Sequence, residues 1–213
     1  MIMLPPIEPL IRRCRALAAL DLILSPEWEY RYYSFNSNWS ENELMASMRD
    51  GSGDEWWAVF HKDGWAALKG LGHASRAWSQ HREALSIALQ RGFPRELTGF
   101  ATEPAFRWEA TSFAYIHPVV GTGWTRINDI AGYSDDDAGD DELLAHLVRG
   151  SSAYAAFASD YYETNIDERV VAEIGRLHPI TDVMVQMLNP STSLKEIADE
   201  LYGMIGYPTY ASN

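Results

Sequence analysis

Apolar residues recur every three or four positions in the first part of the chain, the spacing of one face of an α-helix. This stripe predicts a helix over residues 6–23 and consists of Ile7, Leu10, Ile11, Cys14, Leu17 and Ala18. A second long helix is predicted over residues 75–90, ended by Gly92 and Pro94. Between them, Ser40 and Glu43 have capping-box spacing, which predicts a short helix that stops near residue 51.

Other stretches are rich in aromatic and β-branched residues and predict strands. Residues 28–35 are one such stretch, and residues 54–71 predict a β-hairpin, because the Asp63-Gly64 pair tolerates the positive φ of a tight turn. Two further strands are predicted over residues 108–117 and 124–128.

Beyond residue 129 the pattern becomes helical. Asp140 is expected to cap a helix that ends at Gly150, and Ser193 with Glu196 forms a second capping box. The expected inner faces are Leu143, Leu144, Leu147 and Val148; Tyr154, Phe157, Ala158 and Tyr161; Val170, Val171, Ile174 and Leu177; Val183, Met184, Met187 and Leu188; and Leu194, Ile197, Ala198, Leu201 and Met204.

This order of elements predicts an α+β fold, a mostly antiparallel sheet with inserted helices and an acidic helical C-terminal portion. We expect two portions, residues 1–128 and residues 129–213, the second packed on the first in one compact unit. The C-terminal helices are short and amphipathic, so they need a surface to pack against.

Charge is distributed unevenly along the chain. Residues 1–128 hold 14 Asp and Glu against 13 Lys and Arg, a net charge of −1, whereas residues 129–213 hold 16 against 4, a net charge of −12. Such a balance argues against nucleic acid or an anionic membrane as a partner and favours a basic protein, or it serves solubility alone. The expected acidic partner face is Asp135, Asp136, Asp137, Asp140, Asp141 and Glu142.

No apolar stretch approaches the length of a membrane span, and the first residues lack the pattern of a signal peptide, so we expect a cytoplasmic protein. The single cysteine, Cys14, has apolar neighbours at helical spacing. We therefore expect a buried, unreactive thiol there.

The motif search identifies no catalytic residue, no cofactor site and no metal site. The acidic run is not a calcium loop, because placing Gly139 at the sixth position puts Ala145 at the twelfth, where a Glu is required. The six histidines lack helical zinc spacing, and no glycine-rich stretch has the pattern of a phosphate loop. Residues 181–205 resemble a helix–turn–helix, but the second helix has a net charge of −2 and would be repelled by DNA.

Several segments together resemble a family of bacterial cytosolic proteins of unknown function. They are residues 30–39, 43–53, 103–106, 160–162, 188–190 and 205–208, and the first of them is the most specific. The resemblance covers most of the chain and implies a bacterial cytosolic protein of about this length. It brings no activity with it.

A binding site is predicted near residues 30–39. If this segment is a strand, Tyr32, Asn36 and Asn38 share one face, and the loop with Arg49, Asp50 and Asp54 lies beside them. The leading hypothesis is a non-enzymatic protein-binding module, such as an antitoxin or immunity-type inhibitor of a basic partner. The alternatives are an enzyme acting on a small anionic substrate, with one of these carboxylates as base, and a structural homodimer.

Overall fold

The computed structural model describes residues 2–121, 123–133 and 137–209. Its six strands form one sheet in the order β1-β2-β3-β4-β5-β6, so the chain has the predicted α+β fold. The strands are β1 (Tyr33–Asn36), β2 (Glu43–Arg49), β3 (Glu55–His61), β4 (Ala66–Leu71), β5 (Phe113–His117) and β6 (Thr125–Arg126). None of the helices in the described residues has both the length and the apolar character that crossing a membrane requires.

The chain divides into two compact units whose bounds differ from those of the two portions expected from the sequence. Unit 1 comprises residues 1–7 and 47–145, and unit 2 comprises residues 8–46 and 146–213. Unit 2 is therefore assembled from two stretches of chain that are far apart in the sequence.

Unit 1 is built on the antiparallel strands β3 to β6. The predicted hairpin is confirmed, because Phe60 pairs with Ala66, and Gly64 has a φ of 90° in the turn. The α-helices of this unit are α2 (Arg76–Gly92), α3 (Thr98–Thr102), α4 (Ile127–Ile130) and α5 (Asp140–Leu143). The 3-10 helices are η2 (Arg95–Leu97) and η3 (Pro104–Phe106).

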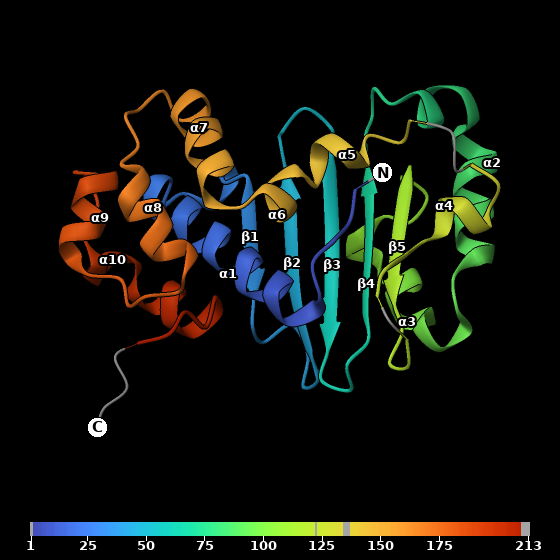
Figure 1. Cartoon of the computed structure of the whole chain (residues 1–213), viewed down its shortest axis with the longest axis horizontal. Helices are drawn as coiled ribbons and strands as arrows, with labels where there is room; N and C mark the ends of the chain where they lie inside the picture. The colour runs from blue at the N-terminus through green and yellow to red at the C-terminus, as the bar shows by residue number, and fades with distance from the viewer. Residues whose placement is uncertain (1, 122, 134–136, 210–213) are drawn as a thin grey trace. The chain divides into compact units, whose positions relative to one another are not determined.

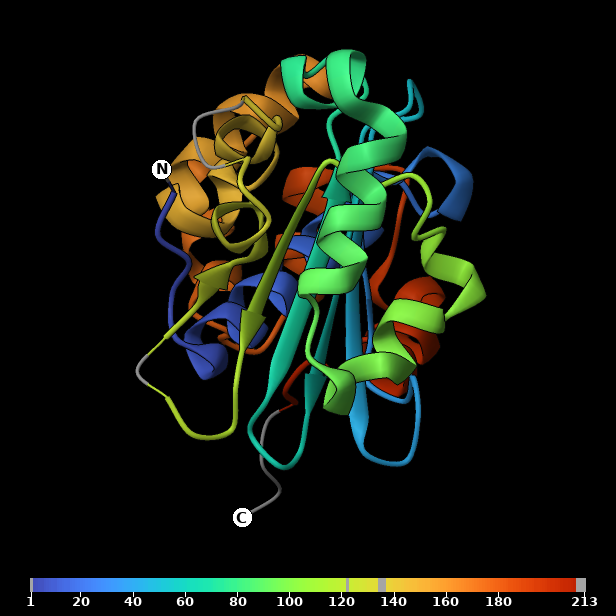
Figure 2. The same ribbon diagram turned by 90° about the vertical axis from the view of Figure 1, so that its right-hand side faces the viewer.

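Helices cover both faces of these strands (Figure 2). The side chains of Trp56 and Trp57 point to opposite faces because they are consecutive in β3. Trp56 Nε1 donates to the carbonyl oxygen of Leu143 in α5, at 3.2 Å. The ring of Trp57 lies 5.3 Å from that of Phe106 in η3, on the other face.

Unit 2 is mainly helical (Figure 1). Its helices are α1 (Ile7–Leu24), η1 (Trp28–Tyr30), α6 (Ala145–Arg149), α7 (Ser151–Tyr161), α8 (Glu168–Gly175), α9 (Asp182–Leu188), α10 (Leu194–Ala198) and the π-helical segment Asp199–Met204. The first helix was predicted within one residue at each end, and the capping box at Ser193 is confirmed. As predicted, Cys14 is buried, and burial raises the pKa of its thiol.

The helix predicted after Ser40 is wrong, because this segment is strand β2. The Ser40 hydroxyl does meet the Glu43 carboxylate, at 3.0 Å, but the contact closes a turn before the strand. Residues 45–48 are all buried. A short run of buried residues does not distinguish strand from helix by its period. The Ser40–Glu43 spacing does not distinguish them either, because the same contact forms in a turn.

Three predicted strands are shorter than expected. The strand predicted over residues 124–128 is reduced to β6, because helix α4 begins at Ile127. Residues 28–30 form η1, and β1 begins only at Tyr33. Residues 107–111 form a turn before β5, in which the Thr111 hydroxyl donates to the Trp108 carbonyl oxygen at 2.7 Å. Local hydrogen bonds of this kind compete with strand pairing, which explains the late start of β5.

The inner faces expected in the C-terminal part are only partly confirmed. The first three residues of the α8 face, Val170, Val171 and Ile174, are buried as expected. Tyr161 and Met204, expected to face inward, are 41% and 47% exposed. Val183 and Met187 of α9 are 66% and 49% exposed. Leu177 lies beyond the end of α8 with a φ of 60°, in the left-handed region. The stripe from residue 143 to 148 is divided between α5 and α6.

Candidate functional site

The predicted binding residues of the first segment belong to unit 2 and have structural roles. The ring of Tyr32 lies 4.6 Å from that of Phe157 in α7. Asn36 accepts the backbone N–H of Asn38 at 2.8 Å, and Asn38 donates to the carbonyl oxygen of Gly203 at 2.7 Å. These contacts attach the end of β1 to the C-terminal helices.

The other predicted binding residues, Arg49, Asp50 and Asp54, belong to unit 1. One oxygen of Asp50 accepts the backbone N–H groups of residues 52–54 at 2.8–3.0 Å. Partial burial favours its neutral form, but these hydrogen bonds outweigh burial and lower its pKa. Asp54 accepts from both the backbone N–H and Nδ1 of His73, at 2.8 and 2.7 Å. The carboxylates that the enzyme hypothesis needs as a base therefore hold the loop together.

The structure distributes the expected acidic partner face over different environments. Asp135 and Asp136 lie outside the described residues. Asp137 is exposed and its carboxylate accepts the backbone N–H of Gly139 at 3.0 Å. Asp141 and Glu142 are exposed in the first turn of α5.

Asp140 is not an exposed helix cap, as the sequence suggested, but a buried partner of Arg126. The guanidinium of Arg126 donates to both carboxylate oxygens of Asp140, at 2.8 and 3.1 Å, and the Tyr115 hydroxyl donates to the same carboxylate. Gly139, with a φ of 84°, occupies the cap position instead. A two-pronged pair with an arginine stabilises a carboxylate more than a single capping bond does.

Within the described residues no group of three or more His, Cys, Asp and Glu side chains is arranged to hold a metal ion.

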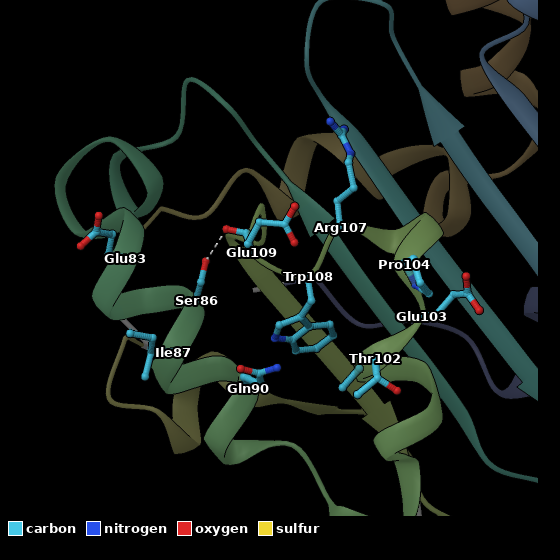
Figure 3. Close-up of a pocket in the computed structure, with 11 residues that line it drawn as sticks. Glu83, Ser86, Ile87, Gln90, Thr102, Glu103, Pro104, Arg107, Trp108 and Glu109 are labelled. Carbon is cyan, nitrogen blue, oxygen red and sulfur yellow. Dashed lines mark hydrogen bonds between the residues drawn. The ribbon is translucent and has the colours of Figure 1, made fainter.

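A cavity of unit 1 lies between α2 and residues 101–109 (Figure 3). We call it the Trp108 pocket. Its volume is about 570 Å³. It is lined by Glu83, Ser86, Ile87, Gln90, Ala101, Thr102, Glu103, Pro104, Arg107, Trp108 and Glu109.

A buried lysine holds the wall of this pocket in place. Lys69, in the middle of β4, is completely buried. Its ammonium group donates to the carbonyl oxygen of Ala110 at 2.9 Å, to that of Arg107 at 3.5 Å and to Glu55 at 3.3 Å. Burial lowers the pKa of Lys69 to about 8, although the charge of Glu55 acts in the opposite direction. The three donors of the ammonium are all used, so Lys69 positions the turn and is not free to act as a base.

Unit 2 displays two aromatic rings on a short turn that we call the aromatic turn, residues 26–30. Trp28 and Tyr30 are 55% and 60% exposed. Glu27 and Glu29, which alternate with them, are exposed as well. The turn thus presents large apolar rings and negative charge together.

The aromatic turn is held from below by Arg31, whose side chain is only 3% exposed. Its guanidinium donates to the carbonyl oxygen of Ser25 at 2.8 Å, to that of Pro26, and to both carboxylate oxygens of Glu200. One buried cation therefore fixes the carbonyl groups of the turn and connects them to the C-terminal helices.

A buried carboxylate lies elsewhere in unit 2. Asp21 of α1 is completely buried and accepts from the Tyr154 hydroxyl and, at 2.5 Å, from the backbone N–H of Tyr33. Burial raises its pKa to about 6, although these hydrogen bonds partly offset the effect. The Tyr33 hydroxyl bonds Nδ1 of His146 at 2.6 Å, and burial lowers the pKa of that imidazole. These contacts join α1, β1, α6 and α7.

Three comparisons with known proteins identify no match for this chain. No protein-family model, no curated protein and no solved structure matches the chain. The resemblance to a bacterial family of unknown function therefore stays a prediction.

Sequence reasoning missed the residues that the structure places at these sites, namely Trp28, Tyr30, Lys69 and Trp108. A signal existed for the first two, because glutamates alternate with aromatic residues from position 27 to 30. For Lys69 the only signal was one cation inside an apolar run.

Proposed function

We propose that the protein is a binding module that captures a basic protein partner through the aromatic turn. The observation that carries the proposal is the exposure of Trp28 and Tyr30, each more than half exposed, in alternation with the exposed Glu27 and Glu29. Tryptophan and tyrosine are enriched among the residues that dominate protein–protein binding energies. A buried role for these two rings is excluded by their exposure.

The hydrogen bonds of Arg31 support this function because they fix the turn before any partner arrives. Ordering a loop on binding costs free energy, and a turn already held by buried hydrogen bonds avoids part of that cost. The backbone at the start of the turn is therefore held in place, which reduces the entropic cost of binding.

Charge supports a basic partner. Glu27 and Glu29 flank the rings, and the whole chain has a net charge of −13. Opposite charge speeds association by roughly ten- to a thousand-fold and disfavours acidic competitors. An inhibitor of antitoxin or immunity type would use such a surface, since it must capture a basic toxin quickly.

The test is selection of a random peptide library, displayed on phage, against the intact protein. We expect the selected peptides to be rich in Lys and Arg next to apolar residues. Their binding should fall at least ten-fold in the variant Trp28→Ala/Tyr30→Ala, because the contact area of both rings is lost, and also in Glu27→Lys/Glu29→Lys, because two attractive charges become repulsive.

The control is Asp63→Lys/Glu142→Lys, which makes the same change in net charge on exposed residues of unit 1. Peptides that bind the aromatic turn keep their affinity for this variant within about three-fold. Equal losses in both charge variants would show that net charge alone attracts the peptides. Selection of neutral or acidic peptides, or of none, would contradict the proposal.

A further inference from the structure

The Trp108 pocket contains a buried hydrogen-bond donor without a partner. Trp108 is 6% exposed, and its indole Nε1 has no hydrogen-bond partner among the described residues. A buried donor without a partner destabilises the structure, so a ligand that supplies an acceptor is favoured. Figure 3 shows the indole nitrogen on the side of the ring that faces α2. The hydroxyl of Ser86, on α2, is already bonded to the carbonyl oxygen of Glu109 at 3.0 Å.

The pocket is large enough for a small organic molecule. Its volume of about 570 Å³ lies within the range of roughly 300–1,000 Å³ that ligand sites occupy. Apolar surface is available, because Ile87, one of the residues that line the pocket, is 50% exposed. A ligand with an apolar body would cover this surface.

The net charge of the residues that line the pocket favours a positively charged ligand. The pocket is lined by three glutamates, Glu83, Glu103 and Glu109, and by one arginine, Arg107. The net charge of its lining is therefore −2. Arg107 donates to Glu55 at 2.5 Å, so its charge is already paired, and Figure 3 shows its side chain directed away from Trp108. One of the glutamates, Glu103, also accepts the backbone N–H of Ala105 at 3.1 Å. An anionic ligand would be repelled by the net negative charge of the lining.

From these three features we infer that the Trp108 pocket binds a small organic cation, consisting of an ammonium or guanidinium group, an apolar body and an acceptor oxygen. The acceptor takes the Trp108 N–H, the apolar body covers Ile87, and the cation lies near the glutamates. The wall that carries Trp108 is held by Lys69, so the site is formed in advance. All of these residues belong to unit 1, so this inference does not depend on the aromatic turn.

The test uses three probes that differ in one feature each. Aminoethyl benzamide has a cation, a ring and a carbonyl oxygen; N-benzoylglycine replaces the cation by an anion; phenylbutylamine lacks the carbonyl. The readout is the NMR spectrum of the indole N–H groups of the eight tryptophans, in which the Trp108 signal is assigned from the backbone and checked with Trp108→Phe.

We expect aminoethyl benzamide to shift the Trp108 indole signal downfield and to saturate it at millimolar concentration or below. N-benzoylglycine should bind about ten-fold more weakly, and phenylbutylamine about five-fold more weakly with no downfield shift, because it cannot accept the N–H. No movement of the Trp108 signal with either cation, or equal binding of N-benzoylglycine, would overturn the inference.

A surface variant and its control test whether the glutamates that line the pocket attract the cation. In Glu83→Gln/Glu109→Gln, aminoethyl benzamide should bind about five-fold more weakly, while N-benzoylglycine should not weaken. The control Asp63→Asn removes an exposed carboxylate that does not line the pocket and should leave both affinities unchanged. A loss in the control equal to that in the double variant would mean that no defined site exists.

Discussion

The ammonium group of Lys69 lies 3.3 Å from a carboxylate oxygen of Glu55, on the neighbouring strand, and neither side chain is more than 6% exposed. Glu55 also accepts from Arg107, at the edge of the Trp108 pocket. The pair therefore connects the interior of the sheet to the wall of the pocket. Its partners determine how each substitution in this cluster should behave.

Replacing Lys69 with Met should destabilise the protein by about 3 kcal/mol, because the Arg107 and Ala110 carbonyl groups lose their donor and Glu55 loses a buried partner. Urea unfolding gives the change in the free energy of unfolding. Adding Glu55→Gln should recover part of the loss. The control Lys62→Met, on the exposed hairpin turn, should stay within about 0.5 kcal/mol of the wild type. A loss below about 1 kcal/mol for Lys69→Met would contradict the role assigned to this lysine.

Asp21 predicts a pH dependence of stability. Its pKa is about 6 when folded, above the ordinary value of 3.8, so the folded state binds more protons between these two pH values. The contribution of Asp21 to the free energy of unfolding is therefore fully present below about pH 4. It falls by about 3 kcal/mol as the pH rises through 6. In Asp21→Asn, which does not titrate, this loss should disappear. Unfolding free energies at several pH values from 4 to 7 measure the difference.

Asp50 is the control, because its effect on stability should change with pH in the opposite direction. Its pKa is lowered in the folded state, so its contribution to stability is present above about pH 4 and is lost as the pH falls through the folded pKa. The difference between wild type and Asp50→Asn should therefore increase as the pH rises from acid values. The same slope in both variants would show that the two carboxylates are not in the environments described.

Arg31→Lys tests the support of the aromatic turn. A lysine keeps the charge but loses the planar fork that reaches Ser25, Pro26 and Glu200 at once. We expect a loss of about 2 kcal/mol in unfolding free energy. The matched control is Arg176→Lys, whose exposed pair with Glu173 should contribute less than about 0.5 kcal/mol. Equal effects would rule out a special role for Arg31.

Gly70 in β4 should not tolerate a methyl group. A Cβ at this position would lie 2.1 Å from the ring of Phe113, which is completely buried in the neighbouring strand. Gly70→Ala should therefore cost about 2–3 kcal/mol through overpacking, and adding Phe113→Leu should recover part of it. Gly99→Ala, with no atom within 4 Å of the new methyl in α3, should be neutral or slightly stabilising. Thermal unfolding of the three variants and the wild type makes the comparison.

Elements marked by local chemistry were predictable from the sequence. The Asp63-Gly64 turn and the stripe of α1 depend on residues that are neighbours in the chain, and both are confirmed. Strand β2 was missed because Ser40 and Glu43 make the same contact in a turn as in a helix cap. For Asp140, the partner that decides its position is Arg126, fourteen residues earlier, and no local pattern announces it.

The two candidate sites were not predictable for a similar reason. The indole N–H of Trp108 has no acceptor among the described residues, and which groups surround it depends on how α2 packs against residues 101–109. The backbone just before Trp28 is held by Arg31, which also bonds Glu200, 169 residues later in the chain. Both are long-range results of packing, and the aromatic composition alone favoured a buried role.

The discontinuity of unit 2 has a consequence for folding during synthesis on the ribosome. Helix α1 is synthesised before residues 47–145, yet two of its partners, the Leu147 carbonyl group that Arg13 binds and the Tyr154 hydroxyl that Asp21 binds, leave the exit tunnel more than a hundred residues later. Residues 47–145 are complete before then and can form their hairpin early. A nascent chain stalled near residue 145 would therefore carry an uncovered apolar helix, a target for chaperones, and α1 would reach its native packing later than a segment synthesised after it.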